Sequence, residues 1–159
     1  MPDYAQSYLG QLRQVIGKRK IHSVGARAIV QDEDGRVLLV KRGDNGRWVM
    51  PAGGLELDEA ILDCCKREVY EETGLTVENA TLIAIYSDPR YSFVTAYGDP
   101  YQMVSFVFRV DAWSGELALE TDETTAIRFF ALDELPELSP LYQETLQDLH
   151  AYDGTPLIK

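Results

Sequence analysis

Apolar residues recur along this chain with two spacings, one typical of helices and one typical of strands. Spacings of three and four residues place side chains on one face of a helix. The segments with helical spacing are residues 4–17, 58–73 and 141–152. Short runs rich in β-branched and aromatic residues predict strands. These runs are residues 21–30, 36–41, 81–86, 103–110 and 126–130. Strands and helices alternate without a regular βαβ rhythm, so we predict an α/β fold with a mixed sheet flanked by helices.

Glycines and prolines mark the segments between these elements. Gly17 is the expected stop of the first helix, and Gly74 follows the second, where a glycine relieves the strain of a left-handed backbone. Residues 31–35 predict a turn, and we expect the strands on either side of it to pair as a hairpin. Residues 43–54 contain four glycines and a proline and are expected to form a loop. The long aromatic-rich segment 87–101 is typical of a binding loop.

Composition places the chain among ordinary globular proteins. Of its 159 residues, 45% are apolar and 26% charged, which favours one domain over residues 1–159, with residues 1–20 as an N-terminal helical extension. No apolar stretch approaches the roughly 20 residues of a membrane span, and residues 1–10 do not resemble a signal peptide. The only cysteines are the neighbours Cys64 and Cys65, which close no loop. We therefore expect a cytoplasmic protein.

The net charge of -11 is unevenly distributed. It argues against bulk nucleic acid and anionic membranes as partners, because both are bound through Lys and Arg. Residues 1–47 carry nine basic and five acidic side chains, and residues 48–110 carry four and ten. Residues 111–159 carry two and eleven, for which, apart from Glu123, we find no role beyond solubility. The densest cluster is residues 56–72, with seven acids and two bases.

This acidic cluster coincides with the second expected helix. Ile61 and Cys65 share one face of it, and the same stripe continues onto Glu68 and Glu72, with Glu71 beside them. Carboxylates this close repel each other unless a cation compensates. Oxygen ligands without nearby His or Cys favour Mg²⁺, with Mn²⁺ as a substitute. The alternative is a solvated helix end, but Glu near a helix C-terminus also opposes the helix dipole.

The glycines before this helix allow the backbone to pass close to it. Residues 51–54 read Pro-Ala-Gly-Gly, and this stretch can turn backbone groups towards the carboxylates. An ordinary turn remains an alternative. The segment is not a P-loop, because no Gly-Lys-Ser/Thr follows. It is not an EF-hand loop either, because the alternating Asp and Asn ligands are missing.

The spacing of these residues resembles a known family. Residues 53–75 fit the pattern G-x5-E-x7-R-E-U-x-E-E-x-G-U, where U is aliphatic, at each specified position. This pattern is similar to the Nudix box, and the resemblance extends over about residues 22–140. It implies an α/β/α sandwich around a mixed sheet. It also implies Mg²⁺-dependent hydrolysis of the pyrophosphate bond in a nucleoside diphosphate linked to another moiety.

The resemblance also implies roles for individual residues. The metal ligands would be Glu68, Glu71, Glu72 and the carbonyl of Ala52. Arg67 would orient and neutralise these glutamates, and Glu59 would be an acid near the helix start. Glu123 is the candidate for a downstream base or extra ligand, with Glu120 as second choice. Gly53 and Gly74 are the glycines of the motif.

Contacts with the substrate are less strongly indicated. Arg27, Arg42 and Arg47 lie in or near the basic N-terminal hairpin and are candidates for phosphate contacts, although a solvent-facing strand position is the stronger explanation for any single one. Trp48 and Tyr91 are candidates for stacking on a base. Core packing is the alternative for both aromatic residues.

The substrate class within the family rests on small similarities. Pro89 and Tyr91 nearly match the downstream residues that distinguish ADP-ribose pyrophosphatases and dinucleoside polyphosphate hydrolases, so the two signals cancel. Ala52 in Pro-Ala-Gly is similar to the ADP-ribose enzymes, which favours a nucleoside diphosphate sugar. The alternatives are a (d)NTP or dinucleoside polyphosphate pyrophosphohydrolase, a non-enzymatic nucleotide sensor, and a calcium-binding structural module. A homodimer is expected because relatives commonly dimerise.

Overall fold

The computed structural model of the protein describes residues 4–95 and 97–159. Residues 1–3 of the expected extension and residue 96 of the aromatic-rich segment lie outside this description. The helices are α1 Tyr8–Ile16, α2 Ile61–Thr73 and α3 Pro140–Ala151, with 3₁₀ turns η1 Tyr4–Gln6 and η2 Pro89–Tyr91. None of the described helices is long and apolar enough to cross a membrane.

The strands form two sheets. Within the described residues, the larger sheet has six strands, in the order β4-β1-β7-β5-β9 with β6 paired to β7. Their bounds are β1 Ile21–Ile29, β4 Ala52–Gly54, β5 Thr76–Tyr86, β6 Ser92–Val94, β7 Pro100–Ser114 and β9 Leu157–Ile158. The smaller sheet has the order β3-β2-β8, with bounds β2 Val37–Arg42, β3 Trp48–Val49 and β8 Thr124–Phe130. β1 pairs in parallel with β7, whereas β5 pairs with β7 in antiparallel fashion, so the larger sheet is mixed as predicted.

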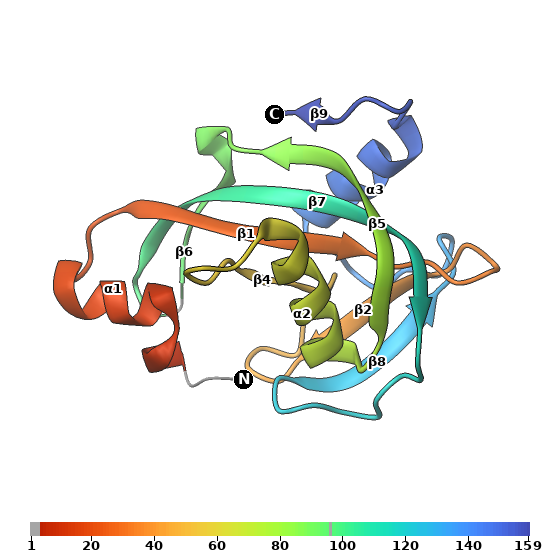
Figure 1. Cartoon of the computed structure of the whole chain (residues 1–159), viewed down its shortest axis with the longest axis horizontal. Helices are drawn as coiled ribbons and strands as arrows, with labels where there is room; N and C mark the ends of the chain where they lie inside the picture. The colour runs from red at the N-terminus through yellow and green to blue at the C-terminus, as the bar shows by residue number, and fades with distance from the viewer. Residues whose placement is uncertain (1–3, 96) are drawn as a thin grey trace.

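Helices α2 and α3 cover opposite faces of the larger sheet, with α2 in front and α3 behind in Figure 1. Side chains alternate between the two faces along each strand. In β1, Ala26 and Ala28 pack on the α2 side, and Ile29 packs on the α3 side. The predicted α/β/α sandwich around a mixed sheet is confirmed.

The predicted hairpin of residues 21–30 and 36–41 is only locally right. The two strands meet at the turn, where the Leu38 N–H donates to the Val30 carbonyl at 2.9 Å. Beyond the turn they separate into different sheets, β1 pairing with β7 and β4, and β2 pairing with β8 and β3. Both strands are largely buried, so each needs hydrogen-bonding neighbours along both edges, and one hairpin partner supplies only one.

Two expected loops contain short strands. Residues 43–54 hold β3 and β4, and residues 87–101 hold η2, β6 and the start of β7. β9 was not predicted either. These strands have two or three residues each, too few for a periodic pattern. They form because strands distant in the sequence supply their hydrogen bonds.

The backbone conformation of two residues explains where α2 begins and ends. The predicted start at residue 58 is three residues early, because Asp58 has a φ of +61°, in the left-handed region, and α2 begins at Ile61. At the other end Gly74 has a φ of +80° and donates its N–H to the Tyr70 carbonyl. The predicted glycine stop is therefore confirmed.

Candidate active site

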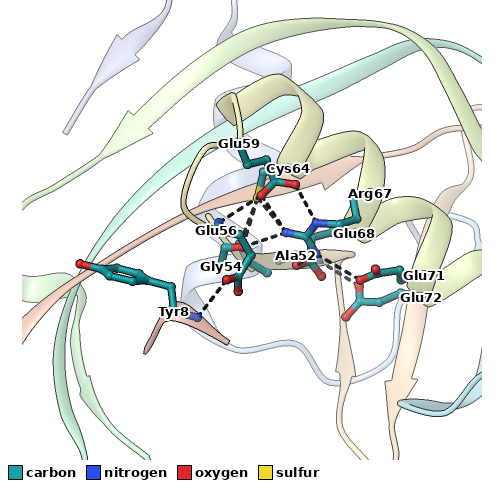
Figure 2. Close-up of polar contacts among 11 residues, drawn as sticks. Tyr8, Ala52, Gly54, Glu56, Glu59, Cys64, Arg67, Glu68, Glu71 and Glu72 are labelled. Carbon is teal, nitrogen blue, oxygen red and sulfur yellow. Dashed lines mark hydrogen bonds and ion pairs between the residues drawn. The ribbon is translucent and has the colours of Figure 1, made fainter. Parts of the chain in front are cut away.

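Arg67 is the centre of the ion pairs on α2. Its Nε and Nη2 donate to the two carboxylate oxygens of Glu59 at 2.7 and 3.0 Å. Its Nη1 donates to Glu68 at 2.6 Å and to Glu71 at 3.1 Å, and Nη2 also donates to the Gly54 carbonyl at 3.0 Å (Figure 2). The hydrogen bonds from Arg67 lower the pKa of Glu59 despite its partial burial. Arg67 thus brings together three of the four glutamates of the sequence pattern, Glu59, Glu68 and Glu71.

Glu68 and Glu72 are buried carboxylates, with 2% and 5% of their surface exposed. Burial raises the pKa of Glu68 to about 7 and that of Glu72 to about 8. Glu72 accepts the Ala52 N–H at 3.0 Å, whereas Oε2 of Glu68 is buried and has no partner among the described residues. A buried carboxylate oxygen without a donor is costly unless a cation reaches it.

Gly53 lets the backbone of β4 approach the Glu68 carboxylate closely. A Cβ atom at this position would lie 2.0 Å from Cδ of Glu68. Any larger residue at this position would have to displace the Glu68 carboxylate. The site thus combines the unpartnered carboxylate oxygen of Glu68, two further glutamates and the carbonyl groups of the adjacent strand β4. All of these are oxygen atoms that can bind a metal ion. This donor set fits Mg²⁺ or Mn²⁺.

The carboxylates are not yet arranged as a complete metal shell. Among the described residues, no group of three His, Cys, Asp or Glu side chains is already placed to hold an ion. The reason lies in their present partners: Arg67 binds one oxygen each of Glu68 and Glu71, and the Ala52 amide binds Glu72. Mg²⁺ usually keeps several waters and binds one or two carboxylates together with substrate phosphates.

Glu123 lies close to this cluster although it is distant in the sequence. The Thr124 hydroxyl donates to the Glu72 carbonyl at 3.2 Å, and the Gly43 N–H donates to the Glu123 carbonyl at 2.8 Å. Burial raises the pKa of Glu123, and the negative charge of Glu71 adds to the effect. Glu120 is exposed. Glu123 is therefore the better placed of the two candidate acids.

A cavity of about 660 Å³ opens on the α3 side of the larger sheet, next to β4. Ala52 and Gly53 form part of its lining, and so do Arg27, Arg42 and Tyr91. The cavity and the acidic helix therefore share the β4 backbone. A ligand in the cavity can reach the edge where the carboxylates lie.

Arg27 is the most unusual residue of this cavity. Only 3% of its surface is exposed, and its Nη1 donates to the Thr145 hydroxyl at 3.0 Å. Its guanidinium lies 4.8 Å from the ring centre of Tyr142, while its Nε has no partner among the described residues. Burial lowers the pKa of Arg27, and only tyrosine hydroxyls oppose this effect. Since no carboxylate of the described residues pairs with it, this buried guanidinium is a candidate for binding an anion.

The other candidate substrate contacts divide between the cavity and the rest of the fold. Arg42 reaches the cavity but is paired with Asp44 at 2.7 Å. Tyr91 is buried, stacks on Tyr86 with ring centres 5.0 Å apart, and presents one side to the cavity. Trp48 packs edge-on against Phe130 at 4.8 Å. Neither Trp48 nor the exposed Arg47 is among the described residues that line the cavity.

Tyr142 and Thr145 were not predicted as site residues from the sequence. Both lie on α3 and contact Arg27, which is more than a hundred positions earlier in the chain. No motif marks them. Only the packing of α3 across the sheet brings them to the cavity.

Comparison with known proteins agrees with this arrangement. A family model described as the NUDIX domain matches residues 21–149. The chain belongs to the Nudix family. It is a hydrolase that acts on phosphoric anhydrides.

Individual Nudix relatives resemble most of the chain. A MutT-like protein of Streptomyces ambofaciens is 38% identical over 135 residues, covering 84% of this chain and 79% of the relative. An ADP-ribose pyrophosphatase of Methanocaldococcus jannaschii is 33% identical over 121 residues, covering 74% and 67%. The crystal structure of a MutT NUDIX hydrolase from Burkholderia pseudomallei superposes with a TM-score of 0.65 at 31% identity, covering 82% of this chain and 98% of the other.

The raised pKa values of Glu68 and Glu72 predict how metal and pH affect stability. Both folded-state pKa values lie above the usual value, so the contribution of these groups to stability is present at acidic pH and is lost as pH rises through about 7 and 8. A divalent cation stabilises the charged forms. In EDTA, the melting temperature should therefore fall from the usual glutamate pKa of 4.5 up to about pH 8 and be level above it. The increase on addition of Mg²⁺ should grow between pH 6 and 9. An Mg²⁺ effect of equal size at pH 6 and pH 9 would contradict this expectation.

Proposed function

We propose that this Nudix enzyme hydrolyses, with Mg²⁺, the pyrophosphate bond of a nucleoside diphosphate linked to another moiety, and that a nucleoside diphosphate sugar such as ADP-ribose is its substrate class. The main support for this proposal is the burial of Arg27 beside Ala52. This buried cation pairs in register with Ala52 across β1 and β4, so an anion receptor lies directly beside the loop of the acidic helix. A pyrophosphate between the two would contact both.

The residues of the site have distinct tasks in this reaction. Glu68, Glu71, Glu72 and the Ala52 carbonyl would hold the metal, which when bound lowers the pKa of water and offsets phosphate charge. Arg67 keeps Glu68 and Glu71 in place through its hydrogen bonds. Glu123, whose pKa burial raises, is the candidate to accept a proton from the attacking water. Arg27 would bind the phosphate that lies away from the metal.

The cavity favours a substrate with a substantial second moiety. Its volume of about 660 Å³ lies in the range of small-molecule sites. Tyr142, Phe93 and Met103 give it apolar walls on which a base can stack. The similarity to an ADP-ribose pyrophosphatase points the same way. The complete set of box glutamates supports catalysis over the role of a nucleotide sensor.

A substrate panel tests the proposal. ADP-ribose, (d)NTPs and dinucleoside polyphosphates are incubated with Mg²⁺ or Mn²⁺, and the products are separated by chromatography. We expect ADP-ribose and water to give AMP and ribose 5-phosphate, without orthophosphate. If the protein instead prefers a (d)NTP and releases a nucleoside monophosphate and pyrophosphate, the proposed nucleoside diphosphate sugar is wrong and a (d)NTP is the substrate class. No turnover of any nucleotide, together with stabilisation by Ca²⁺ alone, would favour the calcium-binding structural module.

A further inference from the structure

Helix α1 lies outside the residues matched by the Nudix family model, yet it contacts the candidate active site. The match begins at residue 21, and α1 ends at Ile16. The N–H of Tyr8, at the first position of α1, donates to Oε2 of Glu56 at 2.9 Å. Glu56 lies in the segment that joins β4 to α2. The N-terminus of one helix is thereby tied to the approach to the other.

This contact is the first in a series of hydrogen bonds that passes from the Glu56 carboxylate to its own backbone N–H and then on to α2. The Glu56 N–H donates to Oε2 of Glu59 at 3.1 Å. Glu59 accepts both Nε and Nη2 of Arg67, and Arg67 in turn donates to Glu68 and Glu71. Figure 2 shows the series running from Tyr8 on one side to the glutamates of α2 on the other. Every step joins polar groups that are at least partly buried.

The bond between Tyr8 and Glu56 satisfies both the Tyr8 N–H and the Glu56 carboxylate. The N–H groups of the first helical turn have no acceptor within their own helix. Ser7 caps α1 by accepting the Gly10 N–H, and Glu56 accepts the Tyr8 N–H. A carboxylate at a helix N-terminus is also stabilised by the positive end of the helix dipole. Glu56 is therefore held in one orientation by α1.

Helix α1 is itself fixed to the larger sheet. Arg13 is buried and donates from Nε to the Tyr101 hydroxyl at 3.1 Å and from Nη2 to the Pro100 carbonyl at 2.7 Å. Its Nη1 donates to the carbonyls of Gly17 and Arg19. The Tyr8 N–H thus has a defined position relative to β7. The series of bonds connects the sheet, through α1, to the glutamates.

We propose that α1 is a positioning element of the active site: its Tyr8 N–H, through Glu56 and Glu59, fixes the orientation of Arg67 and so that of Glu68 and Glu71. Its effect on turnover rests on the proposed metal-dependent hydrolysis. Its effect on metal binding does not require a known substrate. The groups that bond to metal ligands commonly change metal affinity or activity by about 10- to 100-fold when they are removed.

The backbone of α1 offers a variant that removes only the donor. Proline is favoured at the first position of a helix, where its missing N–H has no partner within the helix. Ser7 has φ and ψ of -65° and 159°, the extended conformation that a residue before proline adopts. Tyr8→Pro therefore deletes the N–H without straining α1. Tyr8→Ala removes the same side chain, which points away from the series in Figure 2, and keeps the N–H.

The two variants are compared in the full chain by calorimetric titration with Mg²⁺ and by turnover of the best substrate of the panel. We expect Tyr8→Pro to bind Mg²⁺ about tenfold more weakly than Tyr8→Ala. We also expect its kcat to be about tenfold lower, with a similar KM, because the substrate cavity lies on the other face of the sheet. Equal Mg²⁺ affinity in the two variants would overturn the proposal. If no substrate is found, the proposed function fails, but the Mg²⁺ titration still decides this inference.

A second pair of variants covers the case in which Tyr8→Pro does not fold. Glu56→Gln keeps an oxygen that accepts the Tyr8 N–H, whereas Glu56→Ala removes it. We expect the alanine variant to lose Mg²⁺ affinity by about tenfold relative to the glutamine variant. A merely structural role would lower the melting temperature of Glu56→Ala and leave its Mg²⁺ affinity equal to that of Glu56→Gln, which would overturn the proposal.

Discussion

The Glu72→Gln variant is expected to lose Mg²⁺-dependent turnover while keeping its fold. Glu72 is 5% exposed, and its Oε2 accepts the Ala52 N–H. Glutamine has the same shape and keeps an oxygen for this bond, but it removes the charge of a metal ligand. Metal ions contribute several kcal/mol of charge stabilisation to the transition state, so kcat/KM should fall by about 100-fold or more.

The same substitution should not destabilise the metal-free protein. Burial raises the pKa of Glu72 to about 8, so above pH 8 the wild-type carboxylate carries a charge that the fold disfavours. We expect the melting temperature of Glu72→Gln in EDTA at pH 9 to equal or exceed that of the wild type. Glu78→Gln, at an exposed position of β5, is the matched control. Near-normal Mg²⁺-dependent activity of Glu72→Gln would refute the assignment of the metal site.

The Arg27→Met variant should separate binding from stability. Arg27 is a buried cation whose Nε has no partner among the described residues, and methionine fills a similar space without a charge. A charged hydrogen bond contributes about 1.5–3 kcal/mol. The loss of a phosphate contact should therefore lower kcat/KM by about 10- to 100-fold, chiefly through a higher KM.

The stability of the Arg27→Met variant should not fall with its kcat/KM. Removing an uncompensated buried charge is often neutral or stabilising, so the melting temperature of Arg27→Met should stay equal or rise. Arg109→Met, on β7 and paired with Asp111 at 2.7 Å, is the control arginine outside the cavity lining. A lower melting temperature of Arg27→Met with an unchanged KM would assign Arg27 to the core and not to the substrate.

The acidic helix could be predicted from the sequence because its geometry is local. Glu68, Glu71 and Glu72 share a face of α2 by virtue of their spacing alone. The glycine stop at Gly74 is local for the same reason, since it depends on the backbone freedom of one residue. The start of α2 was predicted less accurately, because the apolar pattern does not show that Asp58 has a left-handed backbone.

The substrate side could not be predicted in the same way. Arg27 and Arg47 are both basic residues near the expected hairpin, and nothing in the sequence shows that only Arg27 is buried in a cavity. Trp48 fitted stacking and core packing equally well from the sequence, and in the structure it is partly buried and packs edge-on against Phe130 of β8. Such differences depend on which strands pair, and the pairing partners of β1 and β2 lie far along the chain.

The family pattern, the converging glutamates and the α/β class could be predicted from the chain alone, because each depends on spacing within a short stretch or on the order of the elements along the chain. The tertiary structure alone decided that β1 and β2 belong to different sheets, that Arg27 meets Tyr142 and Thr145, and that α1 bonds to Glu56. These contacts join residues from 48 to 118 positions apart. Contacts at that separation are set by how whole layers pack, and periodicity along a chain carries no information about them.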